Sequence, residues 1–405
     1  YSYKGGKGVP GPLSLHVERD WFSREIWERC CRVLDEPWTI DELIIDLMGQ
    51  GAESTDLAEL ILPAPYDLQE LFTPTAVQPT YPPVGELQRF PGNPILEPLP
   101  ENDWEASYVL NNAAIRLDGR IYLLYRAFGR DSISRVGLAV TEDGFQITER
   151  LAEPIFSPGT PAEVAGCEDP RLVQIEDRLY MTYTAYDGVV PQIAIASISV
   201  EDFLARRWGR WQRHGLAFPN FPNKDAVIFP ERINGKYAML HRVAPSIWLT
   251  YADTLDCPWP KTGHKIIMGP RYGMLWDAIK IGAGAQPLKT RYGWLLVYHG
   301  VDYALRYSLG VMLVDLVDPE KLLYRSPNPI LVPATEYEQG IRGQVWVPNV
   351  VFTCGAVPTR DTDILEDGDQ ILVYYGAADT YVGVATATVE ELLPIKELEL
   401  LRRGD

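Results

Sequence analysis

Cysteine and histidine are scarce in this sequence. Cys30, Cys31, Cys167, Cys257 and Cys354 are odd in number, and none of them forms a Cys-x-x-Cys pair, so their spacing indicates neither a zinc site nor a disulfide framework. There are five histidines, and too few of them lie near carboxylates to form a metal cluster. We therefore expect no metal and a reduced, cytoplasmic protein.

Long apolar runs and blocks of basic residues are also missing. The longest apolar runs have the length of a strand, so the sequence predicts no contact with a membrane. The formal net charge is −18 and no Lys/Arg block is present. This argues against a nucleic-acid partner, which would require a basic face. The opening stretch, Tyr1–Gly6, does not have the pattern of a signal peptide.

Two common enzyme motifs are absent or incomplete. No Gly-x-Ser-x-Gly appears, so a serine hydrolase is not supported. Gly282-Ala-Gly284 is only a fragment of a dinucleotide fingerprint and lies in the context of a strand. The sequence therefore predicts no nucleotide cofactor.

What the chain does contain is a repeat. Five segments each consist of an apolar strand, a tight turn and an aromatic-rich strand, followed by a strand of small or β-branched residues. The turns are spaced by 58, 58, 58 and 75 residues. About four strands per repeat is typical of a propeller blade, so the sequence predicts an all-β, five-bladed β-propeller. A β-sandwich is the alternative, although it needs no fixed period. The turns lie at Asp118-Gly119, Glu176-Asp177, Asn234-Gly235, Tyr292-Gly293 and Asp367-Gly368.

The repeat does not cover the whole chain. We expect the propeller over 92–395 and a C-terminal tail over 396–405. Residues 1–73 are predicted to form a small helical, winged-helix-like extension, because they include a capping box at Thr39–Glu42. The proline-rich stretch 74–91 is predicted to be a linker that wraps onto the propeller.

Polar side chains recur where the first strands begin and the second strands end. Propellers place the first strand of each blade around a central channel, so these side chains are expected to converge at one end of it. Because a buried charge without a partner is costly, they form either a structural ion-pair network or a site. They include Asn111, Asn112, Glu168, Asp169, Arg171, Lys224, Asp225, Lys280, Asn349, Arg126, Arg242, His299 and Asp379.

At these residues the sequence resembles glycoside hydrolase family 130, the mannoside phosphorylases and β-mannosidases. The resemblance extends over about residues 90–395. Sugar chemistry uses a carboxyl group as acid and often a second one as base, and phosphorolysis also needs a cationic pocket. The matching stretches are Glu168–Arg171, Phe229–Tyr237, Lys280–Gly284, Gly293–Gly300, Val347–Phe352 and Tyr374–Asp379.

The resemblance implies a five-bladed propeller with the sugar in its central funnel. It implies inverting phosphorolysis of a β-mannoside, either a mannobiose, a mannooligosaccharide or a mannosyl-hexose. Asp169 would be the general acid and would act through a hydroxyl of the bound mannose. Phosphate would attack from the opposite face and yield α-mannose 1-phosphate. Phosphate is then a co-substrate, no cofactor is implied, and a homo-oligomer is expected because propellers of this type often associate.

The resemblance also distributes roles among the other residues. One set matches positions that hold the sugar or line the funnel, and a basic set matches positions that bind phosphate. The sugar-binding set is Asn111, Asn112, Arg126, Asp225 and Asp379, and the phosphate-binding set is Lys224, Arg242, Lys280 and His299.

Three positions depart from many of the family's phosphorylases. Lys224 stands where Arg is common, Glu168 where Tyr is common, and Asp225 where Asn is common. Two additional carboxylates beside a cationic pocket would weaken anion binding, and one of them could act as the base for water. An inverting β-mannosidase therefore remains an alternative.

Two further alternatives remain open. The chain could be a sugar-binding propeller without catalysis. The polar residues could also be purely structural, with Lys224 and Arg242 pairing with Asp225 and Glu231. In that case Asp169 would only cap a turn before Pro170.

Overall fold

The computed structural model describes residues 82–271, 273–341 and 344–403. The predicted helical extension over 1–73 and the first part of the predicted linker lie outside these residues. Within them, the secondary structure is mostly antiparallel β with a few short helices, which confirms the prediction of a mostly β chain. None of the helices in these ranges is long and apolar enough to cross a membrane.

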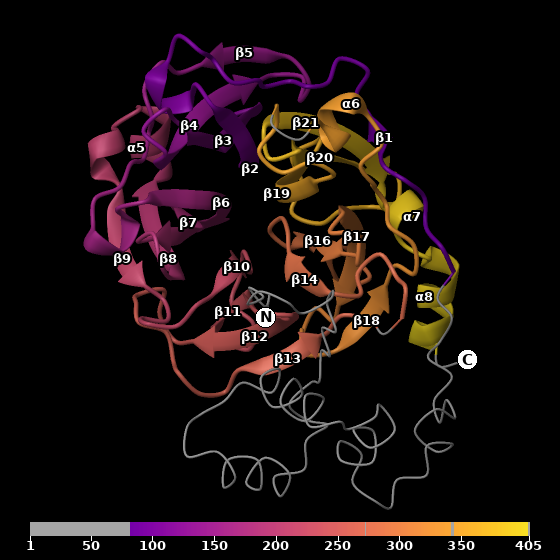
Figure 1. Ribbon diagram of the computed structural model, residues 1–405. Coiled ribbons are helices and arrows are strands. Elements are labelled where there is room, and N and C mark those ends of the chain that lie inside the picture. The colour runs from indigo at the N-terminus through magenta and orange to yellow at the C-terminus, as the bar shows by residue number, and fades with distance from the viewer. Residues whose placement is uncertain (1–81, 272, 342–343, 404–405) are drawn as a thin grey trace, which may run out of the picture. The chain divides into compact units, whose positions relative to one another are not determined.

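The strands form five groups of four. The first two groups belong to one sheet, but only a single parallel bridge between Ser134 and Gly166 joins them. Figure 1 shows the groups around a common centre, with one strand of each group nearest to it. These innermost strands are β2 (Tyr108–Leu117), β6 (Gly166–Ile175), β10 (Lys224–Ile228), β14 (Lys280–Ala283) and β19 (Val351–Pro358).

The other strands of each group follow outward. The second strands are β3 (Arg120–Phe128), β7 (Arg178–Tyr186), β11 (Tyr237–Val243), β16 (Trp294–Val301) and β20 (Gln370–Ala377). The third strands are β4 (Ser134–Thr141), β8 (Pro191–Ser199), β12 (Ser246–Ala252), β17 (Tyr307–Val314) and β21 (Tyr381–Thr388). The outermost strands are β5 (Ile147–Arg150), β9 (Gln212–Leu216), β13 (Lys265–Met268), β18 (Leu322–Arg325) and β1 (Gln88–Arg89), and the short β15 (Leu288–Lys289) pairs with β16.

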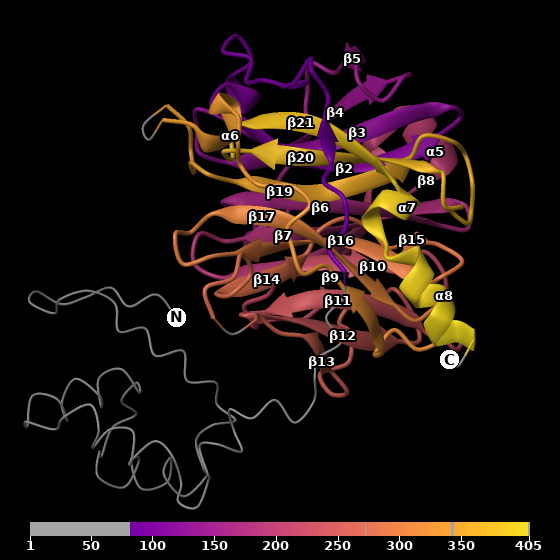
Figure 2. The ribbon, with the colours of Figure 1, turned by 90° about the vertical axis from the view of Figure 1, so that its right-hand side faces the viewer.

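The helices are short and lie in the connections. In Figure 2, α7 and α8 lie at one edge of the strands, and α8 takes up most of the segment predicted as a tail. The helices are α5 (Val200–Leu204), α6 (Glu336–Gln339), α7 (Val389–Leu392) and α8 (Ile395–Arg403), with 3-10 turns η2 (Asp103–Glu105), η3 (Pro161–Glu163) and η4 (Trp208–Arg210).

The predicted turns join the first and second strands. Asp118 and Gly119 have φ of 48° and 75°, and Asn234 and Gly235 have φ of 50° and 80°. Positive φ at both central residues is what a type I′ turn requires, and Asp-Gly and Asn-Gly adopt it most easily. These two turns therefore have the geometry that the sequence predicts.

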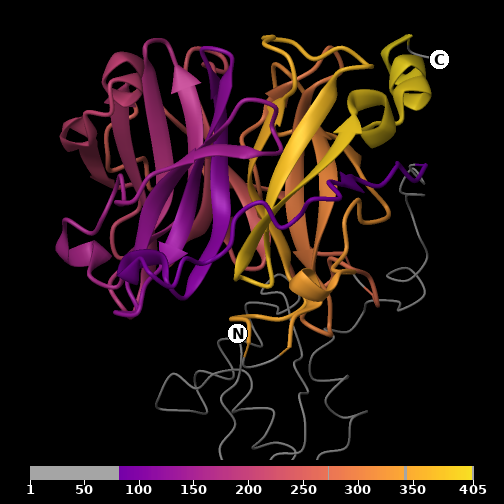
Figure 3. The same ribbon diagram turned by 90° about the horizontal axis from the view of Figure 1, so that it is seen from above.

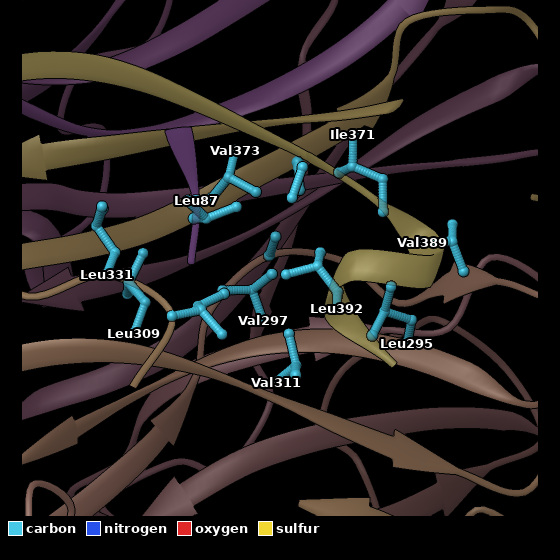
Figure 4. Packing of buried hydrophobic residues seen from close by; sticks show 14 of the residues in the cluster. Leu87, Leu295, Val297, Leu309, Val311, Leu331, Ile371, Val373, Val389 and Leu392 are labelled. Carbon is cyan, nitrogen blue, oxygen red and sulfur yellow. The ribbon is translucent and has the colours of Figure 1, made fainter. Parts of the chain in front are cut away.

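Each group packs its face against the next group through aliphatic side chains. Between the fourth and fifth groups, Val297 and Val311 pack with Ile371 and Val373, and Leu392 from α7 covers their edge (Figure 4). All five side chains are buried. Burial of one such side chain contributes about 1.5–3 kcal/mol, so these interfaces hold the groups together.

A repeated polar clamp fastens four of the five groups from inside to outside. A tyrosine of the second strand donates to a buried carboxylate that precedes the innermost strand. An arginine of the outermost strand binds the same carboxylate. The four sets are Tyr125, Glu105 and Arg150; Tyr183, Glu163 and Arg213; Tyr298, Asp277 and Arg325; and Tyr375, Glu338 and Arg89.

The third group replaces this clamp with neutral side chains. His241 occupies the place of the tyrosine, and its ring nitrogens lie 2.9 Å from Asn223 and 2.8 Å from His264. His264 Nε2 lies 2.8 Å from the carbonyl oxygen of Pro260, which can only accept. Burial lowers the pKa of His241 to about 3, so this ring is neutral and, since the Asn223 amide nitrogen can only donate to it, its own hydrogen lies on Nε2. The hydrogen bonds then run from Asn223 to His241, from His241 to His264, and on to Pro260.

The fifth group takes its outermost strand from the beginning of the described chain. In β1, Gln88 pairs with Thr386 of β21, so residues of the predicted linker complete the last sheet. Figure 3 shows indigo and yellow segments side by side where these ends meet. On the inside, Gln286 Nε2 donates to the carbonyl oxygens of Ala114 and Ala356, which joins the first and last innermost strands.

Candidate active site

Three neighbouring innermost strands share an irregularity near their beginnings. The pairing of β2 with β3, of β6 with β7 and of β10 with β11 shifts register there. Inside each shift one residue adopts the left-handed conformation: Asn111 with φ of 46°, Asp169 with 50° and Asp225 with 56°. Asn and Asp tolerate this conformation better than most residues, and a β-bulge re-aims a side chain. Three of the polar residues that the repeat singled out, Asn111, Asp169 and Asp225, are thus the residues at which the strands deform.

Asp169 is buried and is held by two donors from the first group. Asn111 Nδ2 donates to its Oδ1 over 2.8 Å, and Arg126 donates to the same oxygen over 3.1 Å. No hydrogen bond from the described part of the chain reaches Oδ2, so this oxygen can bind a ligand hydroxyl. Burial opposes ionisation of Asp169, but the neighbouring cations, of which Arg126 has the largest effect, outweigh it and lower its pKa.

Glu168 connects this arginine to a lysine of the third group. Arg126 donates to Oε1 over 2.8 Å, and Lys224 Nζ donates to Oε2 over 2.9 Å. Burial has the largest single effect on the pKa of Lys224 and would lower it, but the charges of Glu168 and Asp169 together outweigh burial, so the pKa is raised. Lys224 therefore carries its positive charge close to Asp169.

Arg171 connects Asp169 with the third and fourth groups. Its guanidinium donates to the main-chain oxygen of Asp169 and to Asp225 Oδ1, both over 3.0 Å. It also donates to the main-chain oxygens of Ala283 and Gly284, over 3.2 Å and 3.0 Å. One buried side chain thus fixes three innermost strands relative to one another.

Asp225 gathers a second cluster of basic residues. Its Oδ2 lies 2.7 Å from Arg242 Nη1 and 3.6 Å from His299 Nε2. Burial alone would raise the pKa of Asp225. The combined effect of Arg242 and the other cations is larger than the effect of burial, so the pKa of Asp225 is lowered. A side chain at Gly282 would collide with the Asp225 carboxylate and the His299 ring, so this glycine permits their close approach.

His299 is neutral and has an unused donor. Burial lowers its pKa to about 3. Arg242 Nη1 lies 3.1 Å from its Nε2 and can only donate, so the ring hydrogen belongs on Nδ1. His299 Nδ1 is buried and has no hydrogen-bond partner in the described ranges. The ring therefore carries no charge of its own and holds a donor that no group in the described ranges uses.

Lys280 is the most available cation of this cluster. Its Nζ lies 5.1 Å from the centre of the Tyr307 ring, which stacks with His299 at a centroid distance of 5.9 Å. No carboxylate in the described ranges lies close enough to Lys280 to form an ion pair. Its charge is thus free to bind an anion.

Asp379 lies in the turn between β20 and β21, where Ala378 and Asp379 have φ of 47° and 48°. Burial and the negative charge of Asp169 raise the pKa of Asp379 to about 7. The two carboxyl groups therefore differ, because Asp169 favours the ionised form and Asp379 can hold a proton near neutrality. Pairs of carboxyl groups with such divergent pKa values are typical of sites that transfer protons.

The structure connects nearly all of the residues that the sequence singled out. Hydrogen bonds and ion pairs link Asn111, Arg126, Asp169, Lys224, Asp225, Arg242 and His299, with Lys280 and Asp379 in electrostatic reach of them. Asn112 is different, because its buried side chain donates only to the carbonyl of Ala113.

The alternative that the polar residues are purely structural predicts ion pairs of Lys224 and Arg242 with Asp225 and Glu231, and only one such pair is present. Arg242 does pair with Asp225, but Lys224 pairs with Glu168, and Glu231 binds Lys289 instead. Asp169 does not act as a turn cap, since its side chain bonds to Asn111 and Arg126.

Two residues of the cluster had no assigned role in the sequence analysis. Arg171 belongs to a stretch that carries the family resemblance, so that stretch was the available signal. Trp346 lies 5.0 Å from the Arg126 guanidinium and directly precedes another such stretch. Its own loop has no periodic pattern that would have indicated it.

The balance of charge favours an anionic ligand. Five cations, Arg126, Arg171, Lys224, Arg242 and Lys280, meet the carboxylates of Glu168, Asp169 and Asp225 and the less acidic Asp379. This excess occurs in a chain with a net charge of −18. In the described ranges, no group of three or more His, Cys, Asp or Glu side chains could hold a metal ion. The arrangement can bind a dianion beside a carboxyl group.

Comparison with known proteins gives consistent matches. The model of glycoside hydrolase family 130, described as β-1,4-mannooligosaccharide phosphorylase, matches residues 87–398. A 1,2-β-oligomannan phosphorylase of Thermoanaerobacter sp. (strain X514) is 39% identical over 316 residues, which are 76% of this chain and 99% of the relative. A β-1,2-mannobiose phosphorylase of the same strain is 40% identical over 320 residues, 76% of this chain and 98% of the relative.

A solved structure matches the same part of the chain. The complex of β-1,2-mannobiose phosphorylase from Listeria innocua with β-1,2-mannobiose has a TM-score of 0.65 and 26% identity. The match covers 78% of this chain and 99% of that structure. Sequence and fold therefore point to the same group of proteins.

Proposed function

The chain belongs to glycoside hydrolase family 130, and on this premise we propose that it is an inverting phosphorylase that converts a β-mannoside and phosphate into α-mannose 1-phosphate. The observation that supports the proposal most directly is that Asp169 lies within a network of cations, which bind Asp169 itself and the neighbouring carboxylates of Asp225 and Glu168. A hydrolase needs a carboxyl group and water, whereas this cluster provides a place for a dianion.

We also infer that the five groups of strands are the five blades of a propeller. Support comes from the ladder of four strands that each group contains, to which the fourth group adds only the short β15, from β1 completing the last group, and from the contact of β19 with β2. An outermost strand that comes from the other end of the chain closes a ring against fraying.

In the proposed reaction the β-mannoside lies between Asp169 and the cations. A proton passes from the Asp169 carboxyl to a mannose hydroxyl, and the proton of that hydroxyl passes to the glycosidic oxygen. The bond between the anomeric carbon and this oxygen breaks, and an oxygen of phosphate forms a new bond from the opposite face. The products are α-mannose 1-phosphate and the released sugar, so atoms and charge balance.

Phosphate binding also explains how Asp169 obtains its proton. In the free protein the cations keep the pKa of Asp169 low. A dianion beside Lys224 and Arg242 offsets their charge, which removes part of the effect that favours the carboxylate. We therefore expect the pKa of Asp169 to rise when both substrates are bound.

The other residues receive roles that follow from their contacts. Asn111 and Arg126 donate to the acid and would orient it, and Arg126 and Asp379 would bind hydroxyl groups of the mannose. Lys224, Arg242, Lys280 and His299 would bind phosphate. Asn112 is retained only as a wall of the sugar site, because its amide bonds locally.

We propose a β-1,2-linked mannobiose or oligomannoside as the substrate. The two relatives that are 39% and 40% identical and are matched almost from end to end are both named for β-1,2-linked substrates.

We also propose a cytoplasmic location for this reaction. The chain has no paired cysteines of the Cys-x-x-Cys type, and its five cysteines are odd in number, which fits a reduced protein.

Hydrolysis is the second candidate, because Glu168 and Asp225 provide carboxylates that a base for water would need. Both are occupied, however. Arg126 and Lys224 each bind one oxygen of Glu168, while Arg171 and Arg242 each bind one oxygen of Asp225. With both oxygens of each carboxylate bound by a cation, neither Glu168 nor Asp225 has an oxygen free to take a proton from water, so phosphorolysis is the better supported reaction.

The deciding experiment is incubation of the full chain with β-1,2-mannobiose, with and without phosphate. We expect α-mannose 1-phosphate and mannose only when phosphate is present, with the α configuration established by NMR of the fresh product. Release of free mannose at an equal rate without phosphate would overturn phosphorolysis in favour of hydrolysis. No reaction of any mannoside, with sugar binding retained, would leave a binding protein.

A further inference from the structure

Trp346 is an exposed aromatic residue beside a buried polar network. Its side chain is 37% exposed, whereas Asp169 and Arg126 are buried. An aromatic ring of this size that remains open next to a site indicates a surface for a ligand.

One face of the Trp346 ring is already occupied. Tyr108 stacks with it at a centroid distance of 5.1 Å and an interplanar angle of 19°, and Phe128 lies 4.8 Å away. The Arg126 guanidinium lies 5.0 Å from the ring centre. Tyr108 pairs with Phe128, and Phe128 and Arg126 are two residues apart in β3, so all three side chains leave the same face of this strand pair.

Because these three side chains leave the same face of the strand pair, we infer that they contact one face of the Trp346 ring, and that the exposed part of the residue is the opposite face and the ring edge. The main-chain N–H of Trp346 donates to Thr380 Oγ1 over 3.0 Å, which ties this part of the main chain to the residue that follows Asp379. Trp346 is therefore anchored both through its main chain and through the contacts of its ring.

The position of the ring suits one particular part of the substrate. Arg126 separates Trp346 from Asp169, because it contacts the ring and donates to the acid. Of the four residues proposed to bind phosphate, Arg242, His299 and Lys280 connect to Asp169 through Arg171 and Asp225 and not through Arg126. The fourth, Lys224, connects to Arg126 through Glu168. Inversion requires the attacking phosphate and the leaving sugar on opposite sides of the anomeric carbon.

We infer that the open face of Trp346 is the platform for the leaving-group sugar of the β-mannoside, an inference that rests on the proposed function. A pyranose presents an apolar face of C–H groups, and an aromatic ring held face-on can pack against it without competing for its hydroxyls. The same platform then binds the acceptor sugar when the reaction runs in the direction of synthesis.

The test measures synthesis from α-mannose 1-phosphate and mannose by wild type, Trp346→Ala and Trp346→Phe. We expect Trp346→Ala to raise the KM for mannose about tenfold or more. The KM for α-mannose 1-phosphate and the kcat at saturating mannose should change less than about twofold, because these report on the other side of the site. Trp346→Phe, which keeps a ring, should restore most of the affinity for the acceptor.

Val317→Ala is the control, because Val317 is an exposed apolar residue in the turn between β17 and β18, at the opposite end of the strands from the turn that holds Asp379. It should leave every constant unchanged. An unaltered KM for mannose in Trp346→Ala, or an equal loss in all constants, would overturn the inference. If Trp346→Ala does not fold, the comparison of Trp346→Phe with Trp346→Leu decides, since only the ring should retain acceptor affinity.

Failure of the proposed function would look different. In that case wild type would form no α-mannose 1-phosphate in either direction. Calorimetric binding of β-1,2-mannobiose would then test the platform alone. About tenfold weaker binding by Trp346→Ala would support it, and equal binding by both proteins would refute it.

Discussion

Asn111 and Asp169 occupy the same bulge position in neighbouring innermost strands and bond to each other, with Asn111 Nδ2 2.8 Å from Asp169 Oδ1. Both have positive φ, 46° and 50°. The amide donor comes from one group of strands and the acid from the next. The acid is therefore oriented by a neighbouring group, which leaves its second oxygen for the substrate.

Replacement of Asp169 by Asn should abolish turnover while leaving the shape of the site intact. General acid catalysis accounts for about 10²–10⁴ in rate, so Asp169→Asn should lower kcat by this factor. Release of α-mannose 1-phosphate measures the rate, and calorimetry with β-1,2-mannobiose measures binding. Asp253→Asn is the control, since Asp253 is an exposed partner of Lys236. Full activity of Asp169→Asn would contradict its role as acid.

Removal of the free lysine should impair phosphate binding specifically. A hydrogen bond to a charged group contributes about 1.5–3 kcal/mol, so Lys280→Ala should raise the KM for phosphate about ten- to hundredfold. Arg242→Ala should act in the same direction but also leave Asp225 with one partner fewer. Lys289→Ala is the matched control, because Lys289 lies in the same sheet as Lys280 but binds Glu231, which belongs to the third group. An equal loss of activity in phosphate-free buffer would contradict the phosphate role.

The variant Glu168→Gln separates phosphorolysis from hydrolysis. It keeps the shape of the side chain but removes the charge that binds Lys224 over 2.9 Å. In a phosphorylase the released lysine should bind phosphate more strongly, so the KM for phosphate should fall several-fold and turnover should persist. If Glu168 were the base for water, product formation would cease in the variant with or without phosphate.

The repeat and its turns could be predicted because their chemistry is local. Asp118-Gly119 and Asn234-Gly235 adopt type I′ geometry through their own conformational preferences, and a period of 58 residues is visible without any structure. The same period brought Asn111 and Asp169 to equivalent positions. The contact between Asn111 and Asp169 then followed from the neighbouring positions of their two innermost strands, β2 and β6.

The partners of individual charges could not be predicted in this way. Arg171 binds Asp225 across 54 residues of chain, and Arg89 binds Glu338 across 249. These pairings depend on how neighbouring groups pack, which no local pattern encodes. The alternative in which Lys224 and Arg242 pair with Asp225 and Glu231 missed Glu168 for this reason, since Glu168 lies 56 residues from Lys224 in the chain and binds it in space.

The neutral histidines should make the stability of the fold depend on pH. Burial lowers the pKa of His241 and His299 to about 3, whereas an unfolded histidine titrates near 6.5. Below pH 6.5 the unfolded chain binds protons that the folded chain does not, so each histidine lowers stability as pH falls toward 3. The slope is about 1.4 kcal/mol per pH unit and histidine. Asp379 has the opposite effect, because its pKa is raised to about 7 in the folded protein. As pH falls below 7 the folded chain binds this proton before the unfolded chain does, so Asp379 raises stability and offsets the loss from one of the two histidines.

The variant His241→Gln tests this dependence. It cannot take up a proton, so its free energy of unfolding should vary with pH less steeply than that of wild type between pH 4 and 6, by about 1.4 kcal/mol per unit. Urea denaturation at several pH values gives both slopes. At pH 8 the histidine is neutral in both states and the slopes should agree. Equal slopes at pH 5 would show that His241 is charged in the folded protein.

The closing strand should contribute strongly to stability through a single arginine. Arg89 of β1 binds both oxygens of Glu338, over 2.7 Å and 2.9 Å, and this carboxylate is fully buried. Arg89→Ala leaves its charge without a cation, so the free energy of unfolding should fall by about 3 kcal/mol. Arg120→Ala removes an exposed pair with Glu142 and should cost at most about 1 kcal/mol. Similar losses in urea denaturation would mean that the last group is held by its backbone pairing and core alone. If Arg89→Ala loses more free energy of unfolding than Arg120→Ala, and the double variant Arg89→Ala with Glu338→Gln recovers part of that loss, the unpaired buried charge of Glu338 is the cause.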